Sequence, residues 1–206
     1  CNPNNPTGNL VKRNDIIKLL NYTDALVVVD EAYMEFTDET ESVVDLINYY
    51  DNLIVARTFS KAYGMASARL GYMLGNTDLL TDLMKVKLPY NVNSFTLTLG
   101  VEAVYREKDM KAFVKSVISQ REYLVYKLST LDITVYETYG NFLFVQSKKE
   151  LFSELLDKDI LIRSFGKGYY RITIGTKEEN KELVKALKEV LQWEKVQNQE
   201  LQRKQT

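Results

Sequence analysis

The chain has 206 residues, 45% of them hydrophobic and 27% charged, and its 27 basic and 28 acidic residues give a formal net charge of −1. This balance removes the electrostatic reason to expect nucleic acid or an anionic membrane surface as a partner. One cysteine and no histidine exclude an internal disulfide framework, Ser/His or Cys/His catalysis and His-based zinc sites, so we expect no metal.

The first part of the chain predicts an α/β domain. Residues 2–8, NPNNPTG, hold two of the three prolines and predict a turn. Asn14 is expected to cap a short helix. Apolar runs, too short to cross a bilayer, then predict strands at 25–29, 53–55 and 70–74. A helical pattern between the first two of these strands favours a mostly parallel sheet.

The second part of the chain has a different pattern of predicted helices and strands. Helical patterns occupy 78–88 and 94–131, and short strands and helices then alternate, with strands expected at 133–136, 142–146, 160–163 and 170–174 and helices near 148–157 and 178–193. These elements predict a second, smaller α+β unit. We therefore divide the chain into part of a large α/β domain (1–95), connecting helices (96–130), a small C-terminal α+β domain (131–195) and a polar tail (196–206).

Charged and hydroxyl side chains follow two of the predicted strands. Asp30 ends the first strand and Lys61 follows the second, and ligands of open parallel sheets lie beyond the carboxyl ends of the strands. Taken singly, Asp30 could cap a turn and Lys61 could be solvated, since charged residues at strand ends are common. With Thr58, Ser60 and Arg69 nearby as phosphate ligands, the set suits pyridoxal phosphate, whose aldehyde needs a lysine and whose ring nitrogen needs an acid.

Four motifs carry a resemblance to a known family. They are NPNNPTG, VVVDEAY, TFSKAYGMASARLGY and YYRITIGTKEEN, in this order between residues 2 and 180. The chain resembles the fold-type I aminotransferases and, among them, the histidinol-phosphate aminotransferases, a choice that PYNVN at 89–93 also favours. The resemblance implies an α/β fold in which a pyridoxal-phosphate domain with a mostly parallel sheet precedes a smaller α+β domain.

The resemblance assigns roles around the cofactor ring. Lys61 would form the internal aldimine with pyridoxal phosphate, and Asp30 would keep the pyridine nitrogen protonated. Tyr33 and Asn5 would hydrogen-bond the phenolic oxygen of the ring. Glu31 is expected to pair locally rather than to take part in catalysis.

The remaining roles concern phosphate and substrate. Thr58, Ser60 and Arg69 would hold the cofactor phosphate, and Arg171, in YYRIT, would bind the carboxylate of the amino donor. Arg163, in ILIRSFG, resembles the position that holds the phosphate of the substrate, although a surface ion pair is an equally good interpretation. Catalytic roles thus fall on Lys61, Asp30 and Tyr33.

The implied reaction is a transamination between histidinol phosphate and 2-oxoglutarate in histidine biosynthesis, with ping-pong kinetics. A phospho-amino-acid decarboxylase of the same fold and an inactive or regulatory binding module are the alternatives. The resemblance also implies small-molecule amino donors and acceptors, a homodimer and a cytoplasmic location. Because family members carry a large segment before the NPNNPTG loop, we expect this chain to be the C-terminal part of a longer protein and to transaminate poorly alone.

Overall fold

The computed structural model describes the backbone of residues 1–203 and the side chains of residues 1–191. The chain clusters into two compact units, here called unit 1 (Cys1–Asn5 and Asn9–Lys115) and unit 2 (Pro6–Gly8 and Ser116–Thr206). The domain limits expected near residues 95 and 131 stay a prediction, as does the polar tail at 196–206, which lies outside the residues whose side chains are described. In the part of the chain that the structure describes, no helix is both long and apolar enough to span a membrane.

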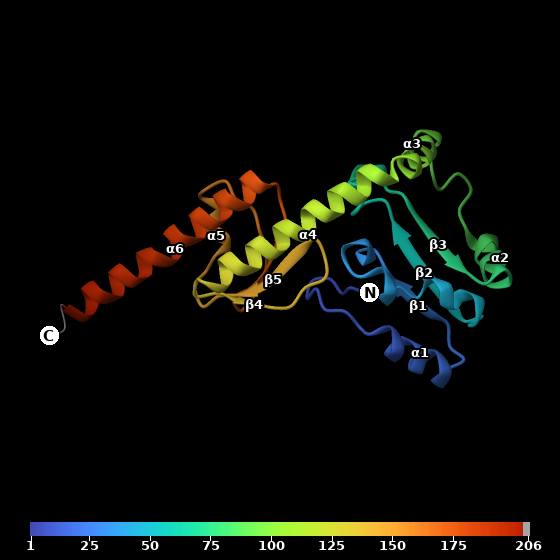
Figure 1. Ribbon diagram of the computed structural model, residues 1–206, viewed down its shortest axis with the longest axis horizontal. Helices are drawn as coiled ribbons and strands as arrows, with labels where there is room; N and C mark the ends of the chain where they lie inside the picture. The colour runs from blue at the N-terminus through green and yellow to red at the C-terminus, as the bar shows by residue number, and fades with distance from the viewer. Residues whose placement is uncertain (204–206) are drawn as a thin grey trace. The chain divides into compact units, whose positions relative to one another are not determined.

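Unit 1 is a small sheet with helices around it (Figure 1). Its elements are α1 (Arg13–Tyr22), β1 (Val27–Asp30), η1 (Met34–Phe36), η2 (Glu39–Glu41), η3 (Val44–Asn48), β2 (Leu53–Thr58), η4 (Ala66–Ala68), β3 (Gly71–Gly75), α2 (Thr77–Val86) and α3 (Ser94–Tyr105), where η denotes a 3₁₀ helix. Strand β1 pairs with β2 in parallel, and β3 pairs with β2 antiparallel. The carboxyl ends of β1 and β2 therefore lie at the same edge of the sheet.

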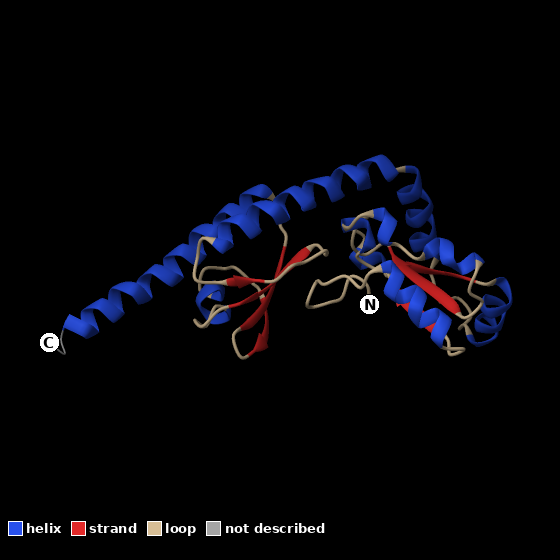
Figure 2. Ribbon diagram, turned by 60° about the horizontal axis from the view of Figure 1, so that its bottom comes forward, coloured by secondary structure: helices blue, strands red, loops and turns tan. Residues whose placement is uncertain are grey.

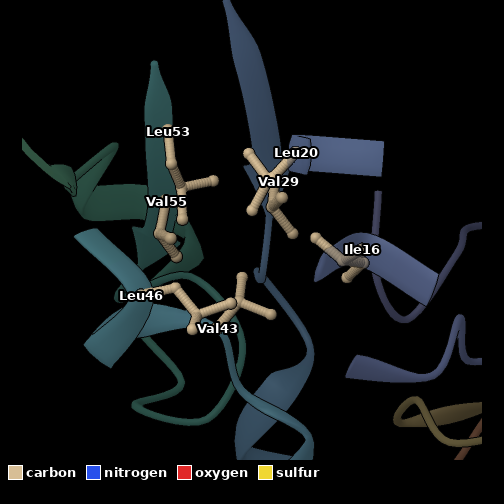
Figure 3. Close-up of a cluster of buried hydrophobic side chains, with 7 residues drawn as sticks. All are labelled: Ile16, Leu20, Val29, Val43, Leu46, Leu53 and Val55. Carbon is tan, nitrogen blue, oxygen red and sulfur yellow. The ribbon is translucent and has the colours of Figure 1, made fainter. Parts of the chain in front are cut away.

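The core of unit 1 lies between α1, the sheet and the η3 segment (Figure 3). Its buried side chains are Ile16, Leu20, Val29, Val43, Leu46, Leu53 and Val55. Each such side chain contributes roughly 1.5–3 kcal/mol on burial. This packing holds β1 and β2 side by side. It therefore determines the positions of Asp30 and Thr58, the last residues of the two strands.

The start of α1 corrects the prediction of an Asn14 cap. The helix begins at Arg13, and Lys12, its N-cap residue, forms no side-chain cap hydrogen bond. The Arg13 N–H donates instead to a carboxylate oxygen of Glu41, at 3.0 Å. A residue distant in sequence thus satisfies the helix end, which is why the local pattern missed it.

Unit 2 contains the C-terminal part of α4 (Glu107–Ser129), followed by β4 (Thr134–Val135), β5 (Phe142–Gln146), α5 (Phe152–Leu156), β6 (Arg163–Gly166), β7 (Tyr169–Thr173) and α6 (Lys177–Arg203). The strands form an antiparallel sheet in the order β4-β5-β7-β6. Helices gather along one side of these strands (Figure 2). The buried side chains between them include Leu124, Leu128, Leu143, Val145, Tyr170, Ile172, Leu183 and Leu187.

Strand β6 begins later than the apolar run at 160–163 predicts. Ile160 still belongs to the C-terminal end of α5, because its N–H donates to the Leu155 carbonyl at 2.9 Å. The preceding residue, Asp159, has a φ of 59°, in the left-handed region. The strand can pair with β7 only from Arg163 onward, where Arg163 lies opposite Arg171. This register brings two predicted site residues together.

Candidate active site

Asp30 ends β1 at the edge of the sheet where β2 also ends. It lies opposite Ala56 in the parallel register. Its carbonyl accepts a hydrogen bond from the Asn2 N–H (2.8 Å), which ties the N-terminal loop to the strand end. One carboxylate oxygen accepts from the Ala32 N–H at 3.1 Å, so Asp30 does cap a turn, yet its side chain remains exposed.

Tyr33, Asn5 and Lys61 come together beside this strand end. The Tyr33 ring is buried, and its hydroxyl accepts a hydrogen bond from the Asn5 side-chain amide at 3.0 Å. The Lys61 Nζ lies 5.3 Å from the centroid of the Tyr33 ring, a distance at which a ring face attracts a cation. Three predicted site residues from separate segments therefore share one location.

The segment that carries Lys61 is folded back on itself. The Thr58 hydroxyl accepts from the Ser60 N–H (3.0 Å) and donates to the Leu70 carbonyl (3.2 Å). The Gly64 N–H donates to the Lys61 carbonyl at 3.0 Å, and Gly64 itself has a φ of +67°, which glycine tolerates at no steric cost. These bonds hold Thr58, Ser60 and Lys61 in one compact turn at the end of β2.

Arg69 closes this segment in an unusual conformation. Its φ is 52°, in the left-handed region that residues other than glycine seldom adopt. Its exposed guanidinium donates to the Ala66 carbonyl at 3.1 Å. Such strained positions concentrate at ligand-binding sites, where surrounding structure holds them in place.

Next to the site lies a buried ion cluster that sequence reasoning found only in part. Glu31 is fully buried and paired, but its partners are not local: its carboxylate lies 2.6 Å from Arg57 Nη2 and accepts from the Val43 N–H at 2.7 Å. Arg57 Nη1 also donates to Glu35 at 2.9 Å. The sequence predicts neither Arg57 nor Glu35. Arg57 could have been found as a charged residue inside the apolar strand β2, whereas Glu35 lies in η1 and carries no such signal.

The cluster has shifted acid–base properties. Burial raises the pKa of the Glu35 carboxyl, and the attraction of Arg57 offsets this only in part. Burial alone would lower the pKa of Arg57, but the facing charges of Glu31 and Glu35 outweigh it and raise that pKa. One guanidinium faces two carboxylates here, and the raised pKa of Glu35 favours its neutral form, as expected for a buried structural group.

The predicted cofactor ligands differ from this cluster in their ion pairing. Within residues 1–191, Asp30, Lys61 and Arg69 form no ion pair, and the Ser60 hydroxyl makes no hydrogen bond. An acid, an amine and a guanidinium at one sheet edge remain available for a ligand with complementary groups. Pyridoxal phosphate has a basic ring nitrogen, an aldehyde and a phosphate, so these residues fit it.

Arg163 and Arg171 belong to unit 2. They lie directly opposite each other on β6 and β7 and line one pocket of about 350 Å³ together with Phe152, Leu161, Ile162 and Thr173. The Arg171 guanidinium carbon also lies 5.5 Å from the centroid of the Phe142 ring. Two guanidinium groups at one pocket suit carboxylate and phosphate groups, which arginine binds through paired hydrogen bonds.

Comparisons with known proteins agree with the motifs. The sequence model of the family described as aminotransferase class I and II matches residues 1–187. Histidinol-phosphate aminotransferase 1 of Carboxydothermus hydrogenoformans is 42% identical over 197 residues, covering 93% of this chain. The alignment covers 56% of that relative, so the chain spans little more than half of its length.

Solved structures extend the similarity to the fold. The histidinol-phosphate aminotransferase from Clostridium acetobutylicum matches with a TM-score of 0.86 and 25% identity, over 93% of this chain and 62% of that one. The L-threonine-O-3-phosphate decarboxylase from Porphyromonas gingivalis matches with a TM-score of 0.79 and 29% identity, over 91% and 63%. These matches confirm the predicted fold class, and the chain belongs to the class I and II aminotransferases.

Proposed function

We propose that this chain carries the cofactor and substrate residues of a pyridoxal-phosphate-dependent aminotransferase that acts on histidinol phosphate in histidine biosynthesis, with glutamate and 2-oxoglutarate as the second pair. The observation that carries the proposal is the Lys61 amine, held over the Tyr33 ring at the sheet edge where Asp30 ends its strand. The name and 42% identity of the relative from C. hydrogenoformans support the choice of substrate.

Three residues would hold the cofactor ring. Bound pyridoxal phosphate supplies an electron-withdrawing ring that stabilises negative charge on the substrate carbon next to nitrogen. The Asp30 carboxylate would lie against the ring nitrogen and favour its protonated form, as a close opposite charge does. Asn5 fixes the Tyr33 hydroxyl by their hydrogen bond, so both can face the phenolic oxygen.

Lys61 would hold the cofactor through its amine and would then serve as the proton carrier. With cofactor and substrate bound, the Nζ amine would carry a proton between the substrate carbon next to nitrogen and the adjacent carbon of the cofactor. The chain contains no histidine to compete for this role. Thr58, Ser60 and Arg69 would bind the phosphate with hydroxyl and guanidinium donors.

The two arginines of unit 2 would bind different substrate groups, Arg171 the carboxylate and Arg163 the phosphate. We expect Arg171→Ala to slow the reaction with glutamate and with histidinol phosphate alike, by roughly 10- to 100-fold each, because a hydrogen bond to a charged group contributes about 1.5–3 kcal/mol. Arg163→Ala should slow only the phosphorylated substrate. Rates of each half-reaction, followed by cofactor absorbance, test this, with exposed Lys167→Ala as the matched control. An Arg163→Ala enzyme that is equally slow with glutamate would contradict the assignment.

A decarboxylase is the second candidate, since the solved decarboxylase from P. gingivalis is 29% identical to this chain. The deciding experiment supplies pyridoxal phosphate and measures two products. Amino transfer between histidinol phosphate and 2-oxoglutarate without release of carbon dioxide supports the aminotransferase. Carbon dioxide released from O-phosphothreonine without amino transfer supports the decarboxylase. Neither product, with no visible absorbance band from bound cofactor, points to a non-catalytic binding module or to an inactive fragment.

The resemblance further predicts a homodimer and a cytoplasmic location. Support for self-association comes from α3, which exposes apolar side chains around its circumference: Phe95, Leu97, Leu99, Val101, Val104 and Tyr105. A helix that is apolar all round normally lies inside a larger assembly. Sedimentation equilibrium is expected to give twice the chain mass, and a monomer at all concentrations would argue against the dimer.

A further inference from the structure

The left-handed backbone of Arg69 needs support from its neighbours. At a φ of 52°, a residue with a Cβ pays a steric cost of roughly 1–2 kcal/mol. Such a conformation persists only where the surrounding structure determines it. That support must act through the backbone on either side of Arg69.

Hydrogen bonds anchor the backbone on both sides of Arg69. On the C-terminal side, the carbonyl of Leu70, one peptide group further along the chain, accepts from the Phe59 N–H at 3.0 Å and from the Thr58 hydroxyl at 3.2 Å. On the N-terminal side, the Ala68 carbonyl accepts from the Thr96 hydroxyl at 3.1 Å. The C-terminal anchors come from the site segment itself, whereas Thr96 belongs to α3, which supplies none of the predicted ligands.

Thr96 is itself held firmly in place. Its side chain is buried, with 6% of the residue exposed, and its N–H donates to the Asn93 side chain that caps α3, at 2.9 Å. One turn later α3 approaches the same segment closely, since a Cβ on Gly100 would lie 2.5 Å from a methyl carbon of Leu70. Helix α3 is therefore docked on residues 68–70 through Thr96 and Gly100.

We propose that Thr96 is a positioning residue for the phosphate end of the cofactor site, acting through the Ala68 carbonyl on the backbone of Arg69. The inference rests on the proposed function, in which Arg69 binds the phosphate of pyridoxal phosphate. Without the Thr96 hydroxyl, the Ala68 carbonyl loses its partner, and Arg69 can relax toward an ordinary negative φ. Its guanidinium then leaves the phosphate position.

The test compares two forms of the cofactor on two variants. Thr96→Val keeps the shape of the side chain but removes the donor, and Thr96→Ser keeps the donor. We expect Thr96→Val to weaken pyridoxal phosphate binding about fivefold, the effect of one net hydrogen bond. Binding of pyridoxal, which lacks the phosphate, should not change. Thr96→Ser should bind both forms as the native chain does, and absorbance titration gives the dissociation constants.

Two controls separate positioning from a general loss of structure. Thr98→Val removes an exposed hydroxyl of the same helix, which donates to the Ser94 carbonyl at 3.0 Å, and should leave both titrations unchanged. In an Arg69→Ala background, Thr96→Val should have no further effect, because residues that act through one another are not additive. A full additional fivefold loss in that background would overturn the inference.

The backbone of Arg69 can also be followed without any cofactor. Its ¹³Cα and ¹³Cβ chemical shifts report a positive φ, and we expect that signature to be lost in Thr96→Val and kept in Thr96→Ser. An unchanged signature in Thr96→Val overturns the inference, as does equal weakening of pyridoxal phosphate and pyridoxal. A native chain that binds neither form contradicts the proposed function and the phosphate role of Thr96 together, while the shifts still decide whether Thr96 holds Arg69.

Discussion

Replacing Lys61 by alanine is expected to abolish attachment of pyridoxal phosphate and to lower the rate of amino transfer by about 10²- to 10⁴-fold or more. The amine both holds the cofactor and carries the proton, and with no histidine in the chain no nearby group can take over. Steady-state rates and visible absorbance measure the two losses. Tyr33, which lies under the amine, should keep its place in the variant.

Two further variants make this result specific. Lys61→Arg preserves the positive charge but cannot give up its proton near neutral pH, so it should be as inactive as Lys61→Ala. Lys85→Ala removes an exposed lysine that pairs with Asp82 on α2 and should retain native activity. If Lys61→Arg kept substantial activity, the lysine would be an electrostatic residue rather than the proton carrier.

Replacing Arg57 by methionine is expected to lower the free energy of unfolding by about 3–5 kcal/mol, because breaking a buried ion pair leaves an uncompensated charge. Arg57 is the cation that faces both Glu31 and Glu35. Chemical denaturation of the variant and the native chain measures the difference. Arg106→Met, which breaks an exposed pair with Glu102, is the control and should leave stability nearly unchanged.

The loss from Arg57→Met should depend on pH in a defined direction. Burial raises the pKa of Glu35 above its ordinary 4.5 in the folded chain, so folding favours the protonated carboxyl and stability falls as pH rises above 4.5. Removing Arg57 strengthens this effect. The deficit should therefore be larger at neutral pH than in mild acid, and adding Glu31→Gln and Glu35→Gln should recover much of it. If the loss of unfolding free energy in Arg57→Met changes neither with pH nor with these substitutions, Arg57 stabilises the fold through packing and not through its charge.

The positions of Asp30 and Lys61 could be predicted because they depend on local pattern and on one topological rule. An apolar run shows where each strand ends, and parallel strands end at the same edge. The parallel register of β1 and β2 meets that condition. The antiparallel direction of β3 could not be predicted, since a short apolar run carries no information on strand direction.

Features that depend on contacts between distant segments could not be predicted. The Glu31–Arg57 pair, the Glu41 carboxylate at the start of α1 and the Thr96 hydrogen bond to Ala68 each join residues far apart in sequence. The positive φ of Arg69 also leaves no mark in the sequence, because only glycine or asparagine would have signalled it. Residue types indicate the chemistry of this site, and tertiary contacts determine its geometry.

We expect Lys61 to be the residue to which the cofactor binds covalently. The direct measurement is to incubate the chain with pyridoxal phosphate, reduce with borohydride, digest and determine which lysine carries the added mass. We expect one pyridoxyl group on the peptide that contains Lys61. At low cofactor concentration, we expect none on that peptide when Asp30 and Arg69 are both replaced by alanine. A native chain whose Lys61 peptide stays unmodified while exposed lysines such as Lys85 are labelled would contradict it.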